Sequence, residues 1–285
     1  MSQNKIIIIN KNNLDNQNGL KNRYVYKFSK SQQLKGKVSL SSIIMPYSTP
    51  NIYIFNCSFT IRYNTINTAI KIPTGFYTIP ELNYYLQFVM KMTNNNIPYN
   101  IVNGTEVFFI NLLYNIAYYS VEIRISPAVL SGTVGKSGSI YTGNTPQIRF
   151  DDKLNEIVGF PINQFFPPSI QSVSYSTISK NYGLVPNLSP SNVYTILCNL
   201  VNDTINIPSN IIYSFTPNTT YGSNINERPS SLLYVNINSG FYDRITLDLY
   251  DELNQPLLIL DENLIITLYL TLEEWIIYLL NIIIK

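Results

Sequence analysis

The clearest helix signal in the chain lies in Ile72–Met92, which reads IPTGFYTIPELNYYLQFVMKM. Thr78 and Glu81 have the T-x-x-E spacing of a capping box, in which each side chain pairs with a backbone N–H group at a helix start. Pro80 falls in the first turn, where no N–H partner is lost. The apolar residues recur at helical spacing and are Ile79, Leu82, Leu86, Val89 and Met90. The sequence therefore predicts an amphipathic helix that ends before Asn94.

Around this helix, the chain has the pattern of short strands separated by Pro, Asn and Gly turns. Strand patterns cover 37–45, 53–63, 69–72, 99–102, 106–113, 118–125, 193–201, 210–215, 232–237, 244–250 and 264–270. Asn103-Gly104 is the strongest short signal for a hairpin turn. Because the strands do not alternate with helices, a parallel α/β sheet is not expected. We predict an all-β fold: a single jelly roll, or Greek-key β-sandwich, with one amphipathic helix and a loop-rich insertion.

Changes in composition predict the domain boundaries. Residues 1–36 are polar and basic, and we expect an extended N-terminal arm that orders only against a partner. Residues 37–125 and 191–271 are predicted to form the jelly-roll core. Residues 126–190 are rich in Gly, Ser, Pro and Tyr and are predicted to be a loop-rich insertion, either a loop or a small outward subdomain, with a short helix at 151–158.

The C-terminal tail, 272–285, reads LEEWIIYLLNIIIK, and nine of the ten residues from Trp275 to Ile284 are apolar or aromatic. Burying each such side chain is worth roughly 1.5–3 kcal/mol, so we expect the tail to be covered. It is shorter than the about 20 residues of a membrane span. A strand or helix of the same domain, a contact between subunits and a lipid-surface anchor remain as alternatives.

The residue types exclude several catalytic and metal chemistries. The chain has no His, so it lacks Ser-His and Cys-His nucleophile pairs and His-ligated zinc. Cys57 and Cys198 are too few for a four-thiolate site in one chain. We expect both to be reduced core thiols, because they lie in strand-like runs and no secretory signal is recognisable.

Two further patterns resemble functional motifs but do not satisfy their requirements. Gly132–Ser137, GTVGKS, lacks the first glycine of a phosphate-binding loop, since position 130 is Leu130. Three pairs of neighbouring carboxylates occur, at Asp151/Asp152, Asp251/Glu252 and Asp261/Glu262. Neighbours on a strand point to opposite faces, whereas a paired-acid hydrolase needs carboxylates that face each other. A polar turn is expected at 251–256, with a bound calcium ion as the alternative. We therefore predict no catalytic residue, cofactor or metal site, and a structural protein rather than an enzyme.

The charge balance points to protein partners. Charged residues make up 13% of the chain, about half the usual share, and the net charge is +2. This balance argues against binding nucleic acid through phosphate neutralisation. Six cations do cluster near the N-terminus, where they form either a solvated edge or a contact with DNA or an acidic neighbour. They are Lys21, Arg23, Lys27, Lys30, Lys35 and Lys37.

Several stretches, in order, resemble the penton, or minor capsid, proteins of virophages and of polinton-like and adintovirus-like elements. Within 73–87, PTGFYTIPELNYYLQ resembles the family's P-x-G-x-Y signature followed by the helix L-N-x-Y-L-Q. Residues 154–160, LNEIVGF, resemble its short helix ending in Gly-Phe. The other matching stretches are 37–48, 192–202, Tyr221-Gly222 and the closing strand pair at 248–270. The resemblance covers roughly residues 37–271, and neither the insertion at 126–150 nor the tail belongs to it.

The resemblance implies a structural protein of the virion, assembled in the host cytoplasm. Five copies would form the vertex of an icosahedral capsid and contact trimers of the major capsid protein. The arm at 1–36 would then touch DNA or a neighbouring capsid subunit. Two alternatives stay open. One is an outward-displayed jelly-roll attachment or glycan-binding protein, favoured by exposed tyrosines in 164–190 or near Tyr221. The other is a minor or cement capsid protein away from the vertex.

Overall fold

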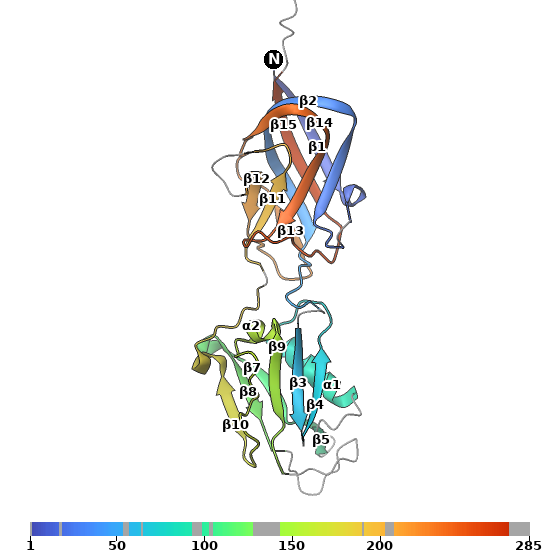
Figure 1. Ribbon diagram of the computed structural model, residues 1–285. Coiled ribbons are helices and arrows are strands. Elements are labelled where there is room, and N and C mark those ends of the chain that lie inside the picture. The colour runs from blue at the N-terminus through green and yellow to red at the C-terminus, as the bar shows by residue number, and fades with distance from the viewer. Residues whose placement is uncertain are drawn as a thin grey trace, which may run out of the picture. The chain divides into compact units, whose positions relative to one another are not determined.

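The structure is a computed structural model. It describes residues 2–16, 19–53, 57–63, 65–92, 99–102, 105–127, 143–189, 191–202 and 208–273. These residues form two compact units, each with its own hydrophobic core (Figure 1). Unit 1 comprises 1–49 and 191–285, and unit 2 comprises 50–190. Unit 2 is therefore inserted, along the chain, between the two halves of unit 1.

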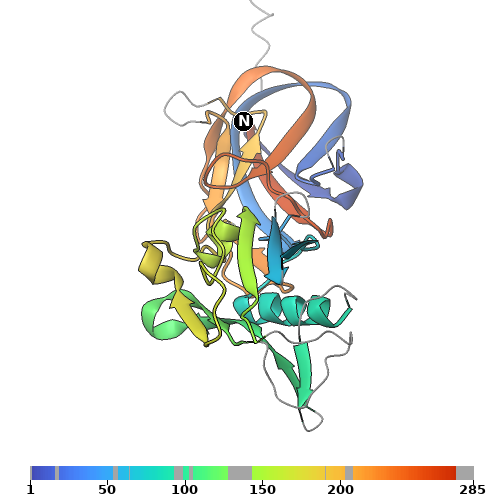
Figure 2. The same cartoon turned by 60° about the horizontal axis from the view of Figure 1, so that its bottom comes forward.

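Unit 1 is built on one curled antiparallel sheet with the strand order β1-β15-β2-β14-β11-β12, and β13 also pairs with β2 (Figures 1 and 2). Its elements are β1 (Ser2–Asn10), η1 (Lys11–Asn13), β2 (Arg23–Pro46), β11 (Tyr194–Cys198), β12 (Ile211–Phe215), β13 (Asn224–Glu227), β14 (Val235–Tyr250) and β15 (Ile265–Glu273). Long strands that change partners produce the curl. The start of β2 pairs with the end of β14, at Arg23 and Asp248, and its end pairs with the start of β15, at Ile44 and Ile265.

The core of unit 1 follows from alternation along these strands. On β15, Ile266, Leu268 and Leu270 point inward and are buried, while the residues between them are partly or fully exposed. This period of two is that of a strand with one face on the core. The pairing of β2 with β14 has a bulge beside Gly36, where the register shifts between Ile237 and Gly240 of β14. Gly36 has φ +136°, a conformation that favours glycine.

Unit 2 contains two three-stranded sheets, one hairpin and the main helix. Its elements are β3 (Cys57–Tyr63), β4 (Ile66–Lys71), α1 (Ile79–Met92), β5 (Tyr99–Val102), β6 (Thr105–Phe108), β7 (Ile110–Asn115), η2 (Ile116–Tyr118), β8 (Ser120–Ile125), β9 (Gln147–Asp152), α2 (Leu154–Val158), β10 (Tyr175–Ile178) and η3 (Ser179–Tyr182). The sheets have the orders β4-β3-β9 and β10-β8-β7, and β5 pairs with β6.

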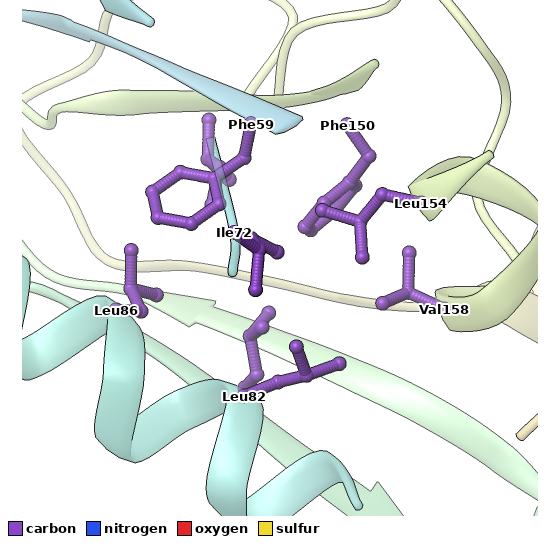
Figure 3. Close-up of a pocket in the computed structure, with 9 residues that line it drawn as sticks. Phe59, Ile72, Leu82, Leu86, Phe150, Leu154 and Val158 are labelled. Carbon is purple, nitrogen blue, oxygen red and sulfur yellow. The ribbon is translucent and has the colours of Figure 1, made fainter. Parts of the chain in front are cut away.

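The interior of unit 2 is closed by side chains from these elements. Leu82 and Leu86 of α1 face Phe59 of β3, Phe150 of β9 and Ile72, which follows β4 (Figure 3). The space left between them is ≈ 10 Å³, which is about the smallest volume that holds one water molecule. This hollow is therefore part of the packed core and leaves no room for a ligand.

The predicted helix is confirmed together with its cap. The N–H of Thr78 donates to Glu81 Oε2 at 2.7 Å, and the N–H of Glu81 donates to Thr78 Oγ1 at 3.4 Å. The buried residues of α1 are the five that its periodicity predicted. Its predicted end at 94–96 lies outside the described residues. The short helix is also confirmed as α2, and Gly159 after it has φ +74°.

The fold class is confirmed: the described residues are mainly antiparallel strands in curled sheets, as in a jelly-roll β-sandwich. The division into units differs from the predicted domains. Residues 1–36 were expected as an arm, but they contain β1 and half of β2, because their partners lie more than 200 positions later. Residues 126–190 were expected as a loop-rich insertion, yet β9 lies within them and pairs with β3, and Ile148 and Phe150 are buried. The inserted unit also begins at Pro50 rather than at 126.

The boundaries of individual strands differ less from those predicted. The predicted strands 232–237 and 244–250 are parts of one bulged strand, β14. The predicted strand 106–113 is divided into β6 and β7. Leu272, the first residue of the predicted tail, is buried in β15, and the rest of the tail after Glu273 lies outside the described residues.

Candidate assembly surface

In the three carboxylate pairs, the side chains that the structure describes contact neighbouring backbone groups, hydroxyl groups or cations. Asp151 accepts a hydrogen bond from Thr60 Oγ1 at 2.6 Å and pairs with Arg149. Asp251 Oδ1 accepts from the N–H groups of Leu253 and Gln255, which makes the polar turn that the sequence predicted.

The other acidic residues also bind neighbouring backbone or cations. Glu252 accepts from the N–H of Asn192 at 3.1 Å and from Ser191 Oγ at 2.9 Å. Asp261 accepts from the N–H of Asn263 at 3.0 Å, and Glu262 pairs with Lys21 at 3.3 Å. Among the described residues, no group of three or more Cys, Asp or Glu side chains is arranged to hold a metal ion.

Both cysteines are buried, as expected for core thiols. Cys198 lies in the core of unit 1, where burial raises the pKa of its thiol to about 12. Cys57 lies in the core of unit 2. The glycine-rich stretch at 132–137 falls outside the described residues. In the part of the chain that is described, no helix is long and apolar enough to cross a membrane.

Tyrosines in 164–190 and near Tyr221, whose exposure would favour an attachment or glycan-binding role, pack against other rings. Tyr221 meets the ring of Tyr47 with centroids 5.8 Å apart. Tyr182 packs edge-on against Phe166 at 5.3 Å, and its hydroxyl lies 3.5 Å from that of Tyr175. These contacts make both clusters part of the fold.

The N-terminal cations are partly neutralised within unit 1. Arg23 pairs with Asp248 at 2.6 Å, and this hydrogen bond raises the pKa of Arg23. Lys35 pairs with Glu273 at 2.7 Å. The first pair joins the start of β2 to β14, and the second joins the middle of β2 to β15.

The surface of unit 1 that stands out is the outward face beside strand β1. In the described sheet, β1 pairs with β15 on one side and forms the edge on the other. The alternation of the strand turns Ile9 inward, where it is fully buried, and turns Ile6 and Ile8 outward, where 63% and 56% of their surfaces are exposed. An edge strand presents unpaired backbone N–H and C=O groups, which natural proteins usually protect with charges or proline. The edge strand here carries one exposed charge, Lys5, and next to it the exposed isoleucines.

Residues of β15 and of the chain before β14 extend this apolar area. Ile6 of β1 lies opposite Tyr269 of β15, and Asn10 lies opposite Ile265. Residues that lie opposite each other point to the same face, so the even positions of β1 share a face with the odd positions of β15. Ile265 and Tyr234 are exposed, and the ring of Tyr234 meets that of Tyr269 at 6.4 Å. We call this area the outer patch; it consists of Ile6, Ile8, Tyr234, Ile265 and Tyr269.

The energetics of the outer patch favour a protein partner. Covering one isoleucine side chain contributes roughly 1.5–3 kcal/mol, so a partner that covers several gains a large driving force. The patch contains no charged side chain whose desolvation would oppose association. Sequence reasoning missed this surface because the run Ile6–Ile9 does not alternate and hides which isoleucines face outward.

Comparison with known proteins finds similarity to solved structures. No protein-family model and no curated protein sequence matches the chain. A crystal structure of selenomethionine-labelled penton protein of mavirus is similar over 95% of this chain and 98% of that chain, with 13% sequence identity and a TM-score of 0.45.

Proposed function

We propose that this protein is a structural capsid protein that forms the pentameric vertex, or penton, of an icosahedral virus particle and contacts the major capsid protein. The observation that carries the proposal is the outer patch at the β1 edge of unit 1. An aliphatic surface beside unpaired backbone groups suits a permanent contact between subunits. The ordered resemblance to penton proteins of virophages supports the vertex as the place of that contact.

In a ring of five copies, the outer patch of one copy must contact a different surface of the next copy, which is a heterologous contact. Such heterologous contacts close into rings when the rotation between subunits allows it. A ring of five is the closed form that an icosahedral vertex requires. The virion, after assembly in the host cytoplasm, is the location that follows from this role.

The mass of the purified chain in solution, measured by light scattering after gel filtration, tests the proposal. We expect a species of five copies of the 32.6 kDa chain. Ile8→Lys should shift the mass towards the monomer, because a buried ammonium group opposes association. Leu253→Lys, at an exposed turn position of the same unit, is the matched control and should leave the mass unchanged.

Two results would contradict the proposal. A stable trimer that Ile8→Lys does not alter would indicate a different assembly. If the chain is monomeric alone, it should still join purified major capsid protein during co-sedimentation, and absence from that pellet would rule out the vertex role.

A further inference from the structure

A second exposed apolar surface lies on unit 2, on the side of α1 opposite its core face. Tyr84, Phe88 and Met92 recur at i, i+4 and i+8 and are exposed, although that side of an amphipathic helix is normally polar. Tyr84 exposes 72% of its surface and Phe88 exposes 44%. The aromatic rings therefore cover a face that the packing of the helix does not use.

The hairpin strand β6 turns this face into a groove. Phe108 and Glu106 of β6 form the wall opposite Tyr84 and Phe88, and the groove between them measures ≈ 100 Å³. The ring of Phe108 stacks on Tyr99 with centroids 5.7 Å apart and planes 18° apart, which holds it in place. We call this feature the aromatic groove.

Polar groups of the aromatic groove are fixed by contacts between the helix and the strands. Gln87 donates from Nε2 to Asn111 Oδ1 at 2.9 Å, and Asn111 donates from Nδ2 to the carbonyl of Phe108 at 3.0 Å. Lys91 and Glu106 form an ion pair across the rim, and the hydrogen bond with Glu106 raises the pKa of Lys91. Asn83 anchors the same helix by accepting from the N–H of Leu112 at 2.8 Å. The site is thus held in shape before any ligand arrives.

The charge of the groove selects among ligand classes. Lys91 and Glu106 cancel each other, so neither an anion nor a cation gains from entering. What remains is a set of aromatic faces beside hydrogen-bonding groups: the Tyr84 hydroxyl, the Gln87 carboxamide and the two rim charges. A pyranose ring matches this set, because its C–H face packs on an aromatic ring while its hydroxyl groups donate and accept at the edge.

We propose that the aromatic groove formed by α1 and β6 binds a neutral pyranose sugar, with Tyr84 and Phe88 packing on the ring and Gln87 and the Lys91–Glu106 pair binding its hydroxyl groups. The groove, of ≈ 100 Å³, is too small to enclose a sugar, so one face of a single sugar unit would rest in it. Binding of a single unit is weak, with a dissociation constant on the order of 1 mM, and several copies in one particle would raise the effective affinity.

The test is binding of methyl glycosides of glucose, galactose, mannose and N-acetylglucosamine to the full chain, measured by saturation-transfer NMR and titration. We expect at least one glycoside to bind, and Tyr84→Ala with Phe88→Ala to weaken it about tenfold. Alanine favours the helix, so these exposed changes should leave the unfolding temperature unchanged. Tyr118→Ala, at an exposed tyrosine elsewhere on unit 2, is the matched control and should bind normally.

Three outcomes would overturn the proposal. The first is no binding of any glycoside at about 10 mM, a concentration well above the expected dissociation constant. The second is binding that the Tyr84 and Phe88 substitutions do not change, which would place the sugar elsewhere. The third is a drop in the mass of the assembled protein caused by the same substitutions, which would make the groove a contact between copies. The proposed capsid role can hold in the first two cases, since it depends on the outer patch alone.

Discussion

The outer patch of unit 1 and the aromatic groove of unit 2 are both exposed and apolar, but they differ in kind. The patch is mainly aliphatic, lies beside unpaired strand backbone and has no charged group. The groove is aromatic, narrow and lined with fixed polar groups. Aliphatic surface gives affinity for any apolar partner of matching shape, whereas polar groups in fixed positions select one ligand. Exposed hydrophobic area by itself therefore does not identify a partner.

The substitution with the largest expected effect tests whether the cores of unit 1 and unit 2 are stable independently of each other. Phe150→Ala removes a ring that is 1% exposed and stacked on Phe160 at 5.6 Å, and should lower the stability of unit 2 by about 3–5 kcal/mol. Hydrogen exchange should show lost protection in β3 and β9 but not in β15, with sugar binding lost and association retained. Phe241→Ala, at an exposed ring, is the control. Equal loss of protection in both units would show that the cores are coupled.

The next effect concerns the strand pairing that supports the outer patch. A Cβ atom at Gly36 would lie 2.1 Å from the carbonyl oxygen of Thr271, and φ there is +136°. Gly36→Ala should therefore cost about 3 kcal/mol and weaken association, because β15 would be displaced from β2. Gly240→Ala on β14 meets nothing closer than 3.6 Å and should stay within about 0.5 kcal/mol. Similar urea midpoints for the two variants would contradict the packing described for the bulge.

A smaller change separates the stability of unit 1 from its association. Ile6→Thr with Ile8→Thr keeps β-branched side chains, so the free energy of unfolding should change by less than about 1 kcal/mol. The dissociation constant of the assembly, measured by analytical ultracentrifugation, should rise about tenfold because apolar contact is lost. Leu253→Thr is the matched substitution outside the patch. An unchanged dissociation constant would remove the patch from the interface.

The smallest expected effect is that the stability of unit 2 depends on pH through Glu122, whereas association through the outer patch does not. The hydrogen bond from Arg124 lowers the pKa of Glu122 from its ordinary value of 4.5, and Ser176 of β10 adds to this. Because the folded pKa is lowered, the contact stabilises unit 2 above pH 4.5 and is lost as the pH falls through the folded value. The outer patch has no carboxylate.

Thermal unfolding of the wild-type protein and of Glu122→Gln at pH 7 and pH 3 tests whether the Glu122 contact stabilises unit 2. The wild-type protein should lose slightly more stability on acidification than the variant does. The same loss in both would show that Glu122 does not contribute. Association through the outer patch should not differ between wild type and variant at either pH.

Local signals in the sequence predict the parts of the fold that depend on neighbours along the chain. The T-x-x-E box, the helical spacing up to Met90 and Gly159 after α2 are each complete within a few residues, so helix positions and burial follow from them. The hairpin β5–β6 is likewise decided around Asn103-Gly104. Strand β1 depends on β15, which is far away in the sequence, and the polar start of β2 depends on β14. Such pairings leave no local pattern, which is why 1–36 resembled an arm.

Local sequence signals were also insufficient to predict the aromatic groove and the outer patch. The helix wheel of α1 already places Tyr84 and Phe88 opposite the buried residues, and that signal was available in the sequence. The opposite wall was not, because Phe108 reaches the helix only through the tertiary fold. For the outer patch, Ile6 and Ile8 cannot be distinguished from Ile7 and Ile9 until the register with β15 is known.

The insertion of unit 2 within unit 1 sets an order for folding during synthesis. Every described strand of unit 2 is synthesised before β11, the first strand in the second half of unit 1. At about 5–20 residues per second, β1 waits roughly tens of seconds for β15. During that time Ile6–Ile9 is an apolar segment of a nascent chain, open to chaperones and to other nascent copies.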